Sequence, residues 1–170
     1  MTEISIRVAQ DDDDYEVARG ICREWLDWHW NAYPEDWPTE GNPMDPEKFE
    51  VTLNDLPEIH ARPRGAILIA FVDGRPAGCV MYNEAETDVA EFNRMFVNEG
   101  GRGHGIGRLM LERMFEEMTA DGYRKVKFSS AKFLTHAKKM YKRAGFSDIP
   151  HPQDFPDAWR KYVYFMERQL

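Results

Sequence analysis

The residues with the clearest chemical meaning form a glycine-rich stretch at positions 97–108, which reads V-N-E-G-G-R-G-H-G-I-G-R. Glycine occupies every second position from Gly101 to Gly107, and arginine stands at Arg102 and Arg108. A strand-like segment precedes the stretch, and a segment with apolar residues at helical i, i+3, i+4 spacing follows it. A glycine-rich turn at a helix start exposes backbone N–H groups without intrahelical partners, and the helix dipole adds positive potential there. The stretch is therefore predicted to bind a phosphate-bearing ligand.

The spacing of these glycines excludes two common phosphate-binding loops. A Walker A loop requires G-x-x-x-x-G-K-[ST], and the chain contains no Gly-Lys-Ser or Gly-Lys-Thr. A dinucleotide fingerprint requires G-x-G-x-x-G, and its third glycine would fall on Ile106 or Arg108 in the two available registers. The pattern that remains is R-x-x-G-x-G, with Arg102, Gly105 and Gly107 at its fixed positions.

This pattern resembles the R/Q-x-x-G-x-G/A motif of the GNAT superfamily of N-acetyltransferases. A second segment, at residues 133–146, is similar to the A-x-x-x-Y-x-x-x-G-F signature of that family. Its matching positions are Ala137, Tyr141, Gly145 and Phe146. Residues 66–81 also resemble the central hairpin of the family, so the resemblance covers about residues 66–168 and, more loosely, the whole chain.

The resemblance implies which residues contact coenzyme A. Backbone groups from Gly103 to Arg108 would hold the pyrophosphate, and Arg102 and Arg108 would add charge-assisted hydrogen bonds. His104 is expected to matter more for its N–H than for its ring. A backbone N–H around residues 95–97 would stabilise the oxyanion of the tetrahedral intermediate. The predicted cofactor contacts are Met95, Phe96, Val97, Arg102, Gly103, His104, Gly105, Ile106, Gly107 and Arg108.

The implied chemistry is attack of an amine on the thioester of acetyl-CoA, the co-substrate. An amine like that of lysine has a pKa near ~10.4, so it must lose a proton before it attacks. The departing thiolate benefits from a proton, and the resemblance gives this role to the phenol of Tyr141, as general acid or hydrogen-bond donor. Inward aromatic packing is the alternative role for Tyr141.

Glu91 is the candidate base, because some relatives have a catalytic glutamate in the corresponding strand. Alternation along the strand predicts that Glu91 lies on the same face as Asn93 and Met95. A solvated or structurally paired Glu91, with the proton leaving through water, is the alternative. Ser129 stands where one protein-acetylating branch of the family has a glutamate, which disfavours N-terminal peptide acetylation.

The acceptor pocket is expected to involve the first two helices and the loop between them. This region contains aromatic and acidic residues, which are Trp25, Trp28, Trp30, Tyr33, Asp36, Trp37 and Glu40. Together they would enclose an amine through cation–π and ion-pair contacts, although ordinary packing is the alternative for the tryptophans. The loops at 34–46 and 150–158 are expected to close over a small acceptor.

Charge is distributed unevenly along the chain. Residues 100–145 contain 11 Lys/Arg and 4 Asp/Glu, a net charge of +7, whereas the whole chain carries −8. A basic segment within an acidic protein argues against nucleic-acid binding and suits a compact polyanion such as coenzyme A. The acidic remainder would attract a cationic amine, or it simply keeps the protein soluble.

The bulk properties indicate a single cytoplasmic domain over residues 1–170, with no membrane span and no signal peptide. Cys22 and Cys79 lie in no metal or redox spacing and are expected to be reduced and buried. The histidines form no i, i+4 pair, and the aspartates at 11–14 are interpreted as a helix cap, so no metal is predicted.

The elements that position these residues alternate between strands and helices. Strands are expected at 4–8, 67–72, 77–82, 88–97, 125–129 and 162–166, and helices after residue 14, from 46 or 47 through 56, up to 120, and at 134–143. Asp73-Gly74 predicts a hairpin turn, and the helix ending at 120 predicts a parallel crossover. The expected fold is α/β, a GNAT-type mixed, mostly antiparallel twisted sheet of about six to seven strands flanked by about four helices.

The predicted function is direct transfer of an acetyl group from acetyl-CoA to a small-molecule amine acceptor. A covalent enzyme intermediate is disfavoured because neither motif offers a nucleophile beside a triad partner. The alternatives are a non-catalytic acyl-CoA sensor and a protein side-chain acetyltransferase. A homodimer is compatible with the family, and the sequence does not identify the acceptor.

Overall fold

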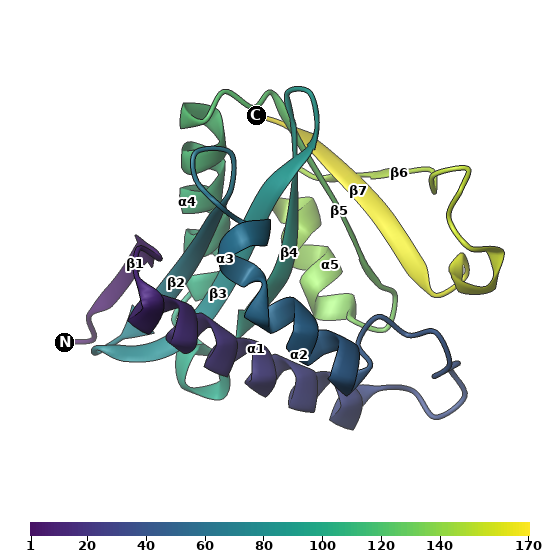
Figure 1. Ribbon diagram of the computed structural model, residues 1–170, viewed down its shortest axis with the longest axis horizontal. Helices are drawn as coiled ribbons and strands as arrows, with labels where there is room; N and C mark the ends of the chain where they lie inside the picture. The colour runs from purple at the N-terminus through teal and green to yellow at the C-terminus, as the bar shows by residue number, and fades with distance from the viewer.

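The fold is built on one seven-stranded sheet with the strand order β1-β2-β3-β4-β5-β7-β6, described by a computed structural model of residues 1–170 (Figure 1). The strands are β1 Ile4–Val8, β2 Ala66–Val72, β3 Arg75–Glu86, β4 Val89–Val97, β5 Lys125–Ala131, β6 Ser147–Ile149 and β7 Val163–Gln169. Only the β4–β5 pair is parallel, and all other neighbours are antiparallel. The predicted mixed, mostly antiparallel sheet of the GNAT type is confirmed.

Five α-helices flank the sheet: α1 Asp12–Ala32, α2 Pro46–Asn54, α3 Leu56–Ile59, α4 Ile106–Ala120 and α5 Thr135–Arg143. Short 3₁₀ turns lie at η1 Glu99–Gly101 and η2 Asp157–Trp159. The count exceeds the expected four because the second predicted helix is divided at Asp55, which ends α2 and precedes α3. Pro57 lies in the first turn of α3, and its missing N–H prevents one continuous helix. None of the helices is both long and apolar enough to cross a bilayer.

Two hydrophobic layers cover opposite faces of the sheet. The fully apolar strand β2 shows the division, since its alternate residues enter different cores. Leu68 belongs to the same buried cluster as Met110 and Met114 of α4, whereas Ile69 belongs to the cluster that contains Ile21 of α1. Helices α4 and α5 therefore cover one face, and α1 to α3 cover the other.

The predicted turn and cap signals act locally as expected. Asp73 and Gly74 both have positive φ, 49° and 78°, as a two-residue turn between antiparallel strands requires. Asp11 caps α1 by accepting a hydrogen bond from the N–H of Asp14, and the Asp14 carboxylate pairs with Arg7 at 2.6 Å. These aspartates thus serve helix capping and an ion pair.

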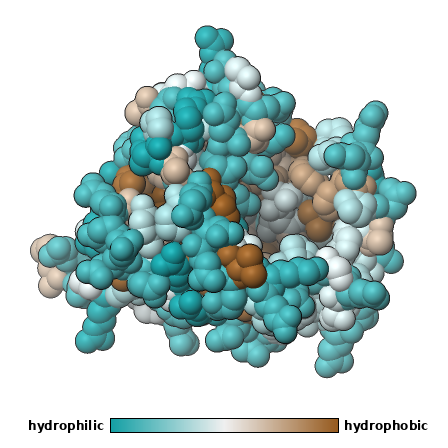
Figure 2. All heavy atoms as spheres, viewed as in Figure 1, coloured by the Kyte–Doolittle hydropathy of each residue, from teal (hydrophilic) through white to brown (hydrophobic).

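Strands β4 and β5 diverge soon after they meet. Their pairing covers only Val89↔Lys125, Ala90↔Val126 and Glu91↔Lys127, although β4 continues to Val97 and β5 to Ala131. Figure 1 shows β5 and β7 leaning away from β4 beyond this point. The edge of β4 that faces β5 consequently has no strand partner after Glu91, and an opening forms in the middle of the sheet. Figure 2 shows a hollow right of centre with apolar residues around it.

A β-bulge in β4 changes which residues face each side. Arg94 adopts a left-handed conformation with φ 52°, and the β3–β4 register shifts between the pairs Met81↔Asn93 and Cys79↔Phe96. Before the bulge, Phe92 packs on the α4–α5 side. Beyond it, Met95 and Val97 pack on that side, and Phe96 packs on the α1 side. The prediction that Met95 shares a face with Glu91 is therefore wrong, because one extra residue reverses the alternation.

Candidate active site

The glycine-rich loop forms a tight turn directly before α4. Gly103 and Gly105 have φ values of 82° and 71°, a region that L side chains rarely adopt. Gly105 is the N-cap of α4, and no side chain caps this helix end. The first helical hydrogen bond of α4 runs from the N–H of Leu109 to the Gly105 carbonyl, at 3.1 Å.

The backbone amides from Gly103 to Arg108 consequently have no backbone acceptor within the chain. The space in front of them is open, since a Cβ atom built on Gly103 or Gly105 would meet no heavy atom within 4 Å. Unpaired N–H groups at the start of a 15-residue helix suit a bound phosphate. The residues present therefore fit the diphosphate of coenzyme A.

Gly107 joins the loop to the two elements behind it. A Cβ atom at this position would lie 2.7 Å from Sδ of Met140 in α5 and 3.7 Å from Cε of Met95 in β4. A side chain at position 107 would therefore require the Met140 side chain to shift. The turn, the end of β4 and the middle of α5 are thus held within contact distance of one another.

The polar side chains of the loop differ in their surroundings. Arg102 is exposed and forms no ion pair, whereas Arg108 donates to Glu112 at 2.8 Å across one helical turn. The ring of His104 is exposed and borders a shallow hollow with Asp73 and Arg75. Of the two arginines in this stretch, Arg102 is therefore the one whose guanidinium is free to bind an anion.

Tyr141 lies on the inner face of α5, at the point where β4 and β5 separate. Its ring centroid is 5.6 Å from that of Phe92 and 4.4 Å from that of Phe128, the first residues beyond the paired part of each strand. The residue is 4% exposed, and its hydroxyl makes no hydrogen bond within the chain. Burial raises the pKa of the Tyr141 phenol, so the hydroxyl keeps its proton at neutral pH.

The candidate base and the candidate oxyanion donors lie along β4. Glu91 is the register partner of Lys127 in the parallel β4–β5 pair, and it does not line the cavity described below. Asn93, two residues further on, does line it. Residues 95–97 follow the bulge on the edge that has no strand partner. The backbone N–H groups of this segment that point away from β3 can therefore donate to a ligand in the opening between the strands.

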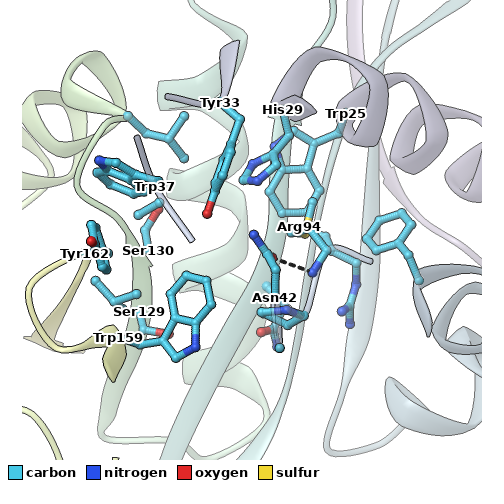
Figure 3. Close-up of a pocket in the computed structure, with 18 of the residues that line it drawn as sticks. Trp25, His29, Tyr33, Trp37, Asn42, Arg94, Ser129, Ser130, Trp159 and Tyr162 are labelled. Carbon is cyan, nitrogen blue, oxygen red and sulfur yellow. Dashed lines mark hydrogen bonds between the residues drawn. The ribbon is translucent and has the colours of Figure 1, made fainter. Parts of the chain in front are cut away.

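A cavity of about 520 Å³ occupies the opening between β4 and β5 on the side of α1 and α2 (Figure 3). Its lining includes eight aromatic residues from segments far apart in the sequence: Trp25, His29, Tyr33, Trp37, Phe49, Phe155, Trp159 and Tyr162. Figure 3 shows Trp37, Tyr162 and Trp159 on one side and His29 and Trp25 on the other. The volume lies within the range of small-molecule sites.

The expected acceptor region is only partly correct. Trp25, Tyr33 and Trp37 line the cavity, but Trp28 packs on Phe96, and Trp30 donates its N–H to the Met44 carbonyl at 2.9 Å. The expected acidic residues, Asp36 and Glu40, are exposed and do not line the cavity. The loops at 34–46 and 150–158 both contribute to the walls.

Sequence reasoning missed Arg94, His29, Trp159 and Tyr162 as cavity residues. Both ring nitrogens of His29 are buried without a partner, and burial lowers its pKa to about 4, so the ring is neutral. No local pattern marks Arg94 or Trp159, because strand divergence and a bulge bring them to the cavity.

The fold and the glycine-rich loop are those of the family that the sequence resembles. A model of the Acetyltransferase (GNAT) family matches residues 22–146, most of the chain, and the chain therefore belongs to this family. It is 32% identical over 112 residues to the IAA acetyltransferase of Azospirillum brasilense, covering 65% of this chain and 71% of that protein. It is 26% identical over 105 residues to the N-acetylaspartate synthetase of Danio rerio, covering 61% of this chain but only 37% of that protein. The family and these relatives identify the chain as an acyltransferase.

Solved structures share the fold over nearly the full length. A GNAT-family acetyltransferase from Staphylococcus aureus Mu50 superposes with a TM-score of 0.75 at 17% identity, covering 99% of both chains. The PaiA N-acetyltransferase from Thermoplasma acidophilum, solved with coenzyme A, gives a TM-score of 0.72 at 20% identity and covers 99% of both chains. At such low sequence identities, the similarity to these structures shows a shared fold only.

Proposed function

We propose that this protein transfers an acetyl group from acetyl-CoA directly to the amine of a small acceptor. The observation that carries the proposal is the row of unpaired amides from Gly103 to Arg108, which meets open space beside the β4–β5 opening. A family structure in complex with coenzyme A and a relative named for N-acetylaspartate, an N-acetylated amino acid, are consistent with it. Residues 1–170 act as one catalytic domain, since both helical layers pack on the same sheet.

The loop holds and aims the co-substrate, which supplies a thioester carbonyl. The amides of 103–108 and the guanidinium of Arg102 bind the diphosphate, while Met95 and Gly107 border the path towards the opening. The unpaired edge of β4 at residues 95–97 donates to the carbonyl oxygen as negative charge develops on it.

The reaction then requires two proton movements. The acceptor ammonium loses its proton to water, and Glu91 is the candidate base that takes the proton from that water. Its carboxylate lies on the same face of β4 as the cavity residue Asn93. The amine nitrogen forms a bond to the carbonyl carbon, the carbon–sulfur bond breaks, and Tyr141 donates a hydrogen bond or a proton to the leaving thiolate. Burial raises the pKa of the Tyr141 phenol, which makes it a weaker acid and favours donation of a hydrogen bond over complete proton transfer.

The size of the cavity favours a small acceptor over a protein side chain. Its volume of about 520 Å³ suits a small molecule, and Trp37 of one loop and Phe155 of another contribute to its walls. Direct transfer is favoured because Cys22 and Cys79 are both buried, and neither lines the cavity.

The test measures release of coenzyme A thiol from acetyl-CoA against amino acids, polyamines, aminoglycosides and peptides. We expect turnover with at least one small amine and no acetylated enzyme by mass spectrometry after acetyl-CoA alone. Binding of acetyl-CoA without thiol release from any amine would instead indicate a sensor. A Glu91→Gln variant with unchanged turnover would assign proton removal to water alone.

A further inference from the structure

Arg94 is the single residue in the cavity lining whose side chain is charged at neutral pH (Figure 3). Its lining includes no Asp, Glu or Lys, and the pKa of His29 is lowered to about 4 by burial, so that ring is neutral. The protein as a whole carries a net charge of −8. The charge inside the cavity is therefore opposite to that of the protein, and it does not favour the cationic acceptor that the acidic composition suggests.

Two neutral groups hold the Arg94 side chain in place. Its Nε donates to Sδ of Met81 at 3.1 Å, and its Nη2 donates to Nε2 of His60 at 2.5 Å. Nδ1 of His60 lies 2.8 Å from the carbonyl of Tyr82, which makes Nδ1 the donor and Nε2 the acceptor. Burial, reinforced by the charge of Arg94, lowers the pKa of His60 to about 4, so His60 remains a neutral acceptor.

No carboxylate balances this cation. Neither contact of Arg94 is an anion, whereas Arg7, Arg62 and Arg113 each pair with an aspartate or glutamate. A guanidinium has five N–H donors, and the remaining ones on Arg94, including those of Nη1, have no partner in the chain and are not sealed from solvent. A partly buried cation without a counter-ion is unfavourable unless a ligand supplies the anion.

We propose that the acceptor is an amine that also carries a carboxylate, as an amino acid does, and that this carboxylate pairs with Arg94. This inference rests on the proposed acetyl transfer and names the substrate class of the same site. The free edge of the guanidinium can bind both carboxylate oxygens. Aromatic walls on the other sides of the cavity suit an apolar side chain, so amino acids such as phenylalanine, methionine and leucine fit better than polyamines.

The kinetic test compares kcat/KM for L-phenylalanine, L-methionine and L-leucine with that for the corresponding amino-acid amides. We expect a preference of roughly 10- to 100-fold for the free acids, the usual effect of a charge-assisted hydrogen bond. Intrinsic reactivity works against this result, because an amide makes the neighbouring amine less basic and leaves more of it unprotonated. In Arg94→Gln the ratio should fall to about 3-fold or less, and Arg94→Lys should keep part of it.

Arg124→Gln is the matched control, because Arg124 is exposed and does not line the cavity. It removes the same charge and should leave the ratio unchanged. The KM for acetyl-CoA should stay constant in Arg94→Gln, which separates lost acceptor recognition from general misfolding. Equal turnover of acids and amides by the wild-type protein, or an unchanged ratio in Arg94→Gln, would overturn the inference.

Binding to the wild-type protein decides the question without turnover and without relying on a folded variant. Calorimetry in the presence of coenzyme A compares 3-phenylpropionate with 3-phenylpropionamide. Tighter binding of the anion supports the inference even if no amine is acetylated, in which case only the proposed function fails. Equal or tighter binding of the amide sinks the inference while leaving acetyl transfer itself untouched.

Discussion

Replacing Tyr141 by phenylalanine should separate catalysis from stability. The phenol ring packs between Phe92 and Phe128, with centroid distances of 5.6 Å and 4.4 Å, and phenylalanine preserves these contacts. The hydroxyl makes no hydrogen bond within the chain, so its removal leaves no group without a partner. We therefore expect the free energy of unfolding to change by less than about 1 kcal/mol.

The rate should respond much more strongly. A proton or hydrogen-bond donor positioned on a leaving group contributes about 10²- to 10⁴-fold. We expect kcat of Tyr141→Phe to fall at least about 100-fold, equivalent to about 2.7 kcal/mol of transition-state stabilisation. Because the substitution lies outside the phosphate-binding turn, the dissociation constant of acetyl-CoA should change by no more than about 3-fold.

The assay combines thiol release under saturating acetyl-CoA with urea unfolding and calorimetric titration of coenzyme A. Tyr164→Phe is the matched control, since Tyr164 belongs to the same aromatic cluster and its buried hydroxyl also lacks a partner. Its kcat should stay at the wild-type value. If Tyr141→Phe also retains wild-type kcat, Tyr141 is a packing residue, and protonation of the thiolate must come from solvent.

Further predictions concern the pH dependence of stability, the glycine-rich loop and the choice of substrate. Burial lowers the pKa of His29 and His60 from 6.5 to about 4. As the pH falls, the unfolded chain therefore binds protons before the folded chain does. The full free energy of unfolding is present above pH 6.5, and it declines as the pH falls towards 4. Each histidine should account for about 3 kcal/mol of that decline in the free energy of unfolding, as measured by urea titrations at several pH values. His29→Phe should make the stability depend less on pH, whereas substitution of the exposed His136 by glutamine should not. A pH-independent stability of the wild-type protein would contradict the assignment. Gly105→Ala should cost about 1–2 kcal/mol of stability because φ is 71°, and should weaken coenzyme A binding, whereas Gly20→Ala, in the middle of α1 with free space around it, should stabilise by about 0.5–1 kcal/mol. Equal effects of the two glycine substitutions in calorimetry and urea unfolding would refute the special role of the turn. The Arg94→Gln variant should lose the preference for free amino acids over their amides.

The conformation of the glycine-rich loop was predictable from the sequence because its geometry is local. Glycine at 103 and 105 permits the left-handed turn, and the apolar spacing after Ile106 fixes where the helix begins. The same holds for the Asp73-Gly74 hairpin and for the cap at Asp11. In each case, residues within a few positions of one another determine the backbone.

The cavity between β4 and β5 was less predictable because it depends on how the two strands separate. Asp36 and Glu40 looked suited to bind an amine, yet their loop turns both towards solvent. Trp159 reaches the cavity only because β7 follows β5 away from β4. The short edge strand β6 carries no clear alternation, and it forms because β7 offers a free edge to pair with.

The bulge at Arg94 has a consequence for how this sequence tolerates change. It acts as a frame shift within a strand: residues before it and after it obey opposite inside–outside rules. Deleting that one residue would restore regular alternation and send Met95 and Val97 to the wrong side of the sheet. Residue number at this position is therefore under a constraint of its own, separate from the role proposed for the Arg94 side chain, and a one-residue deletion there should cost more stability than a substitution.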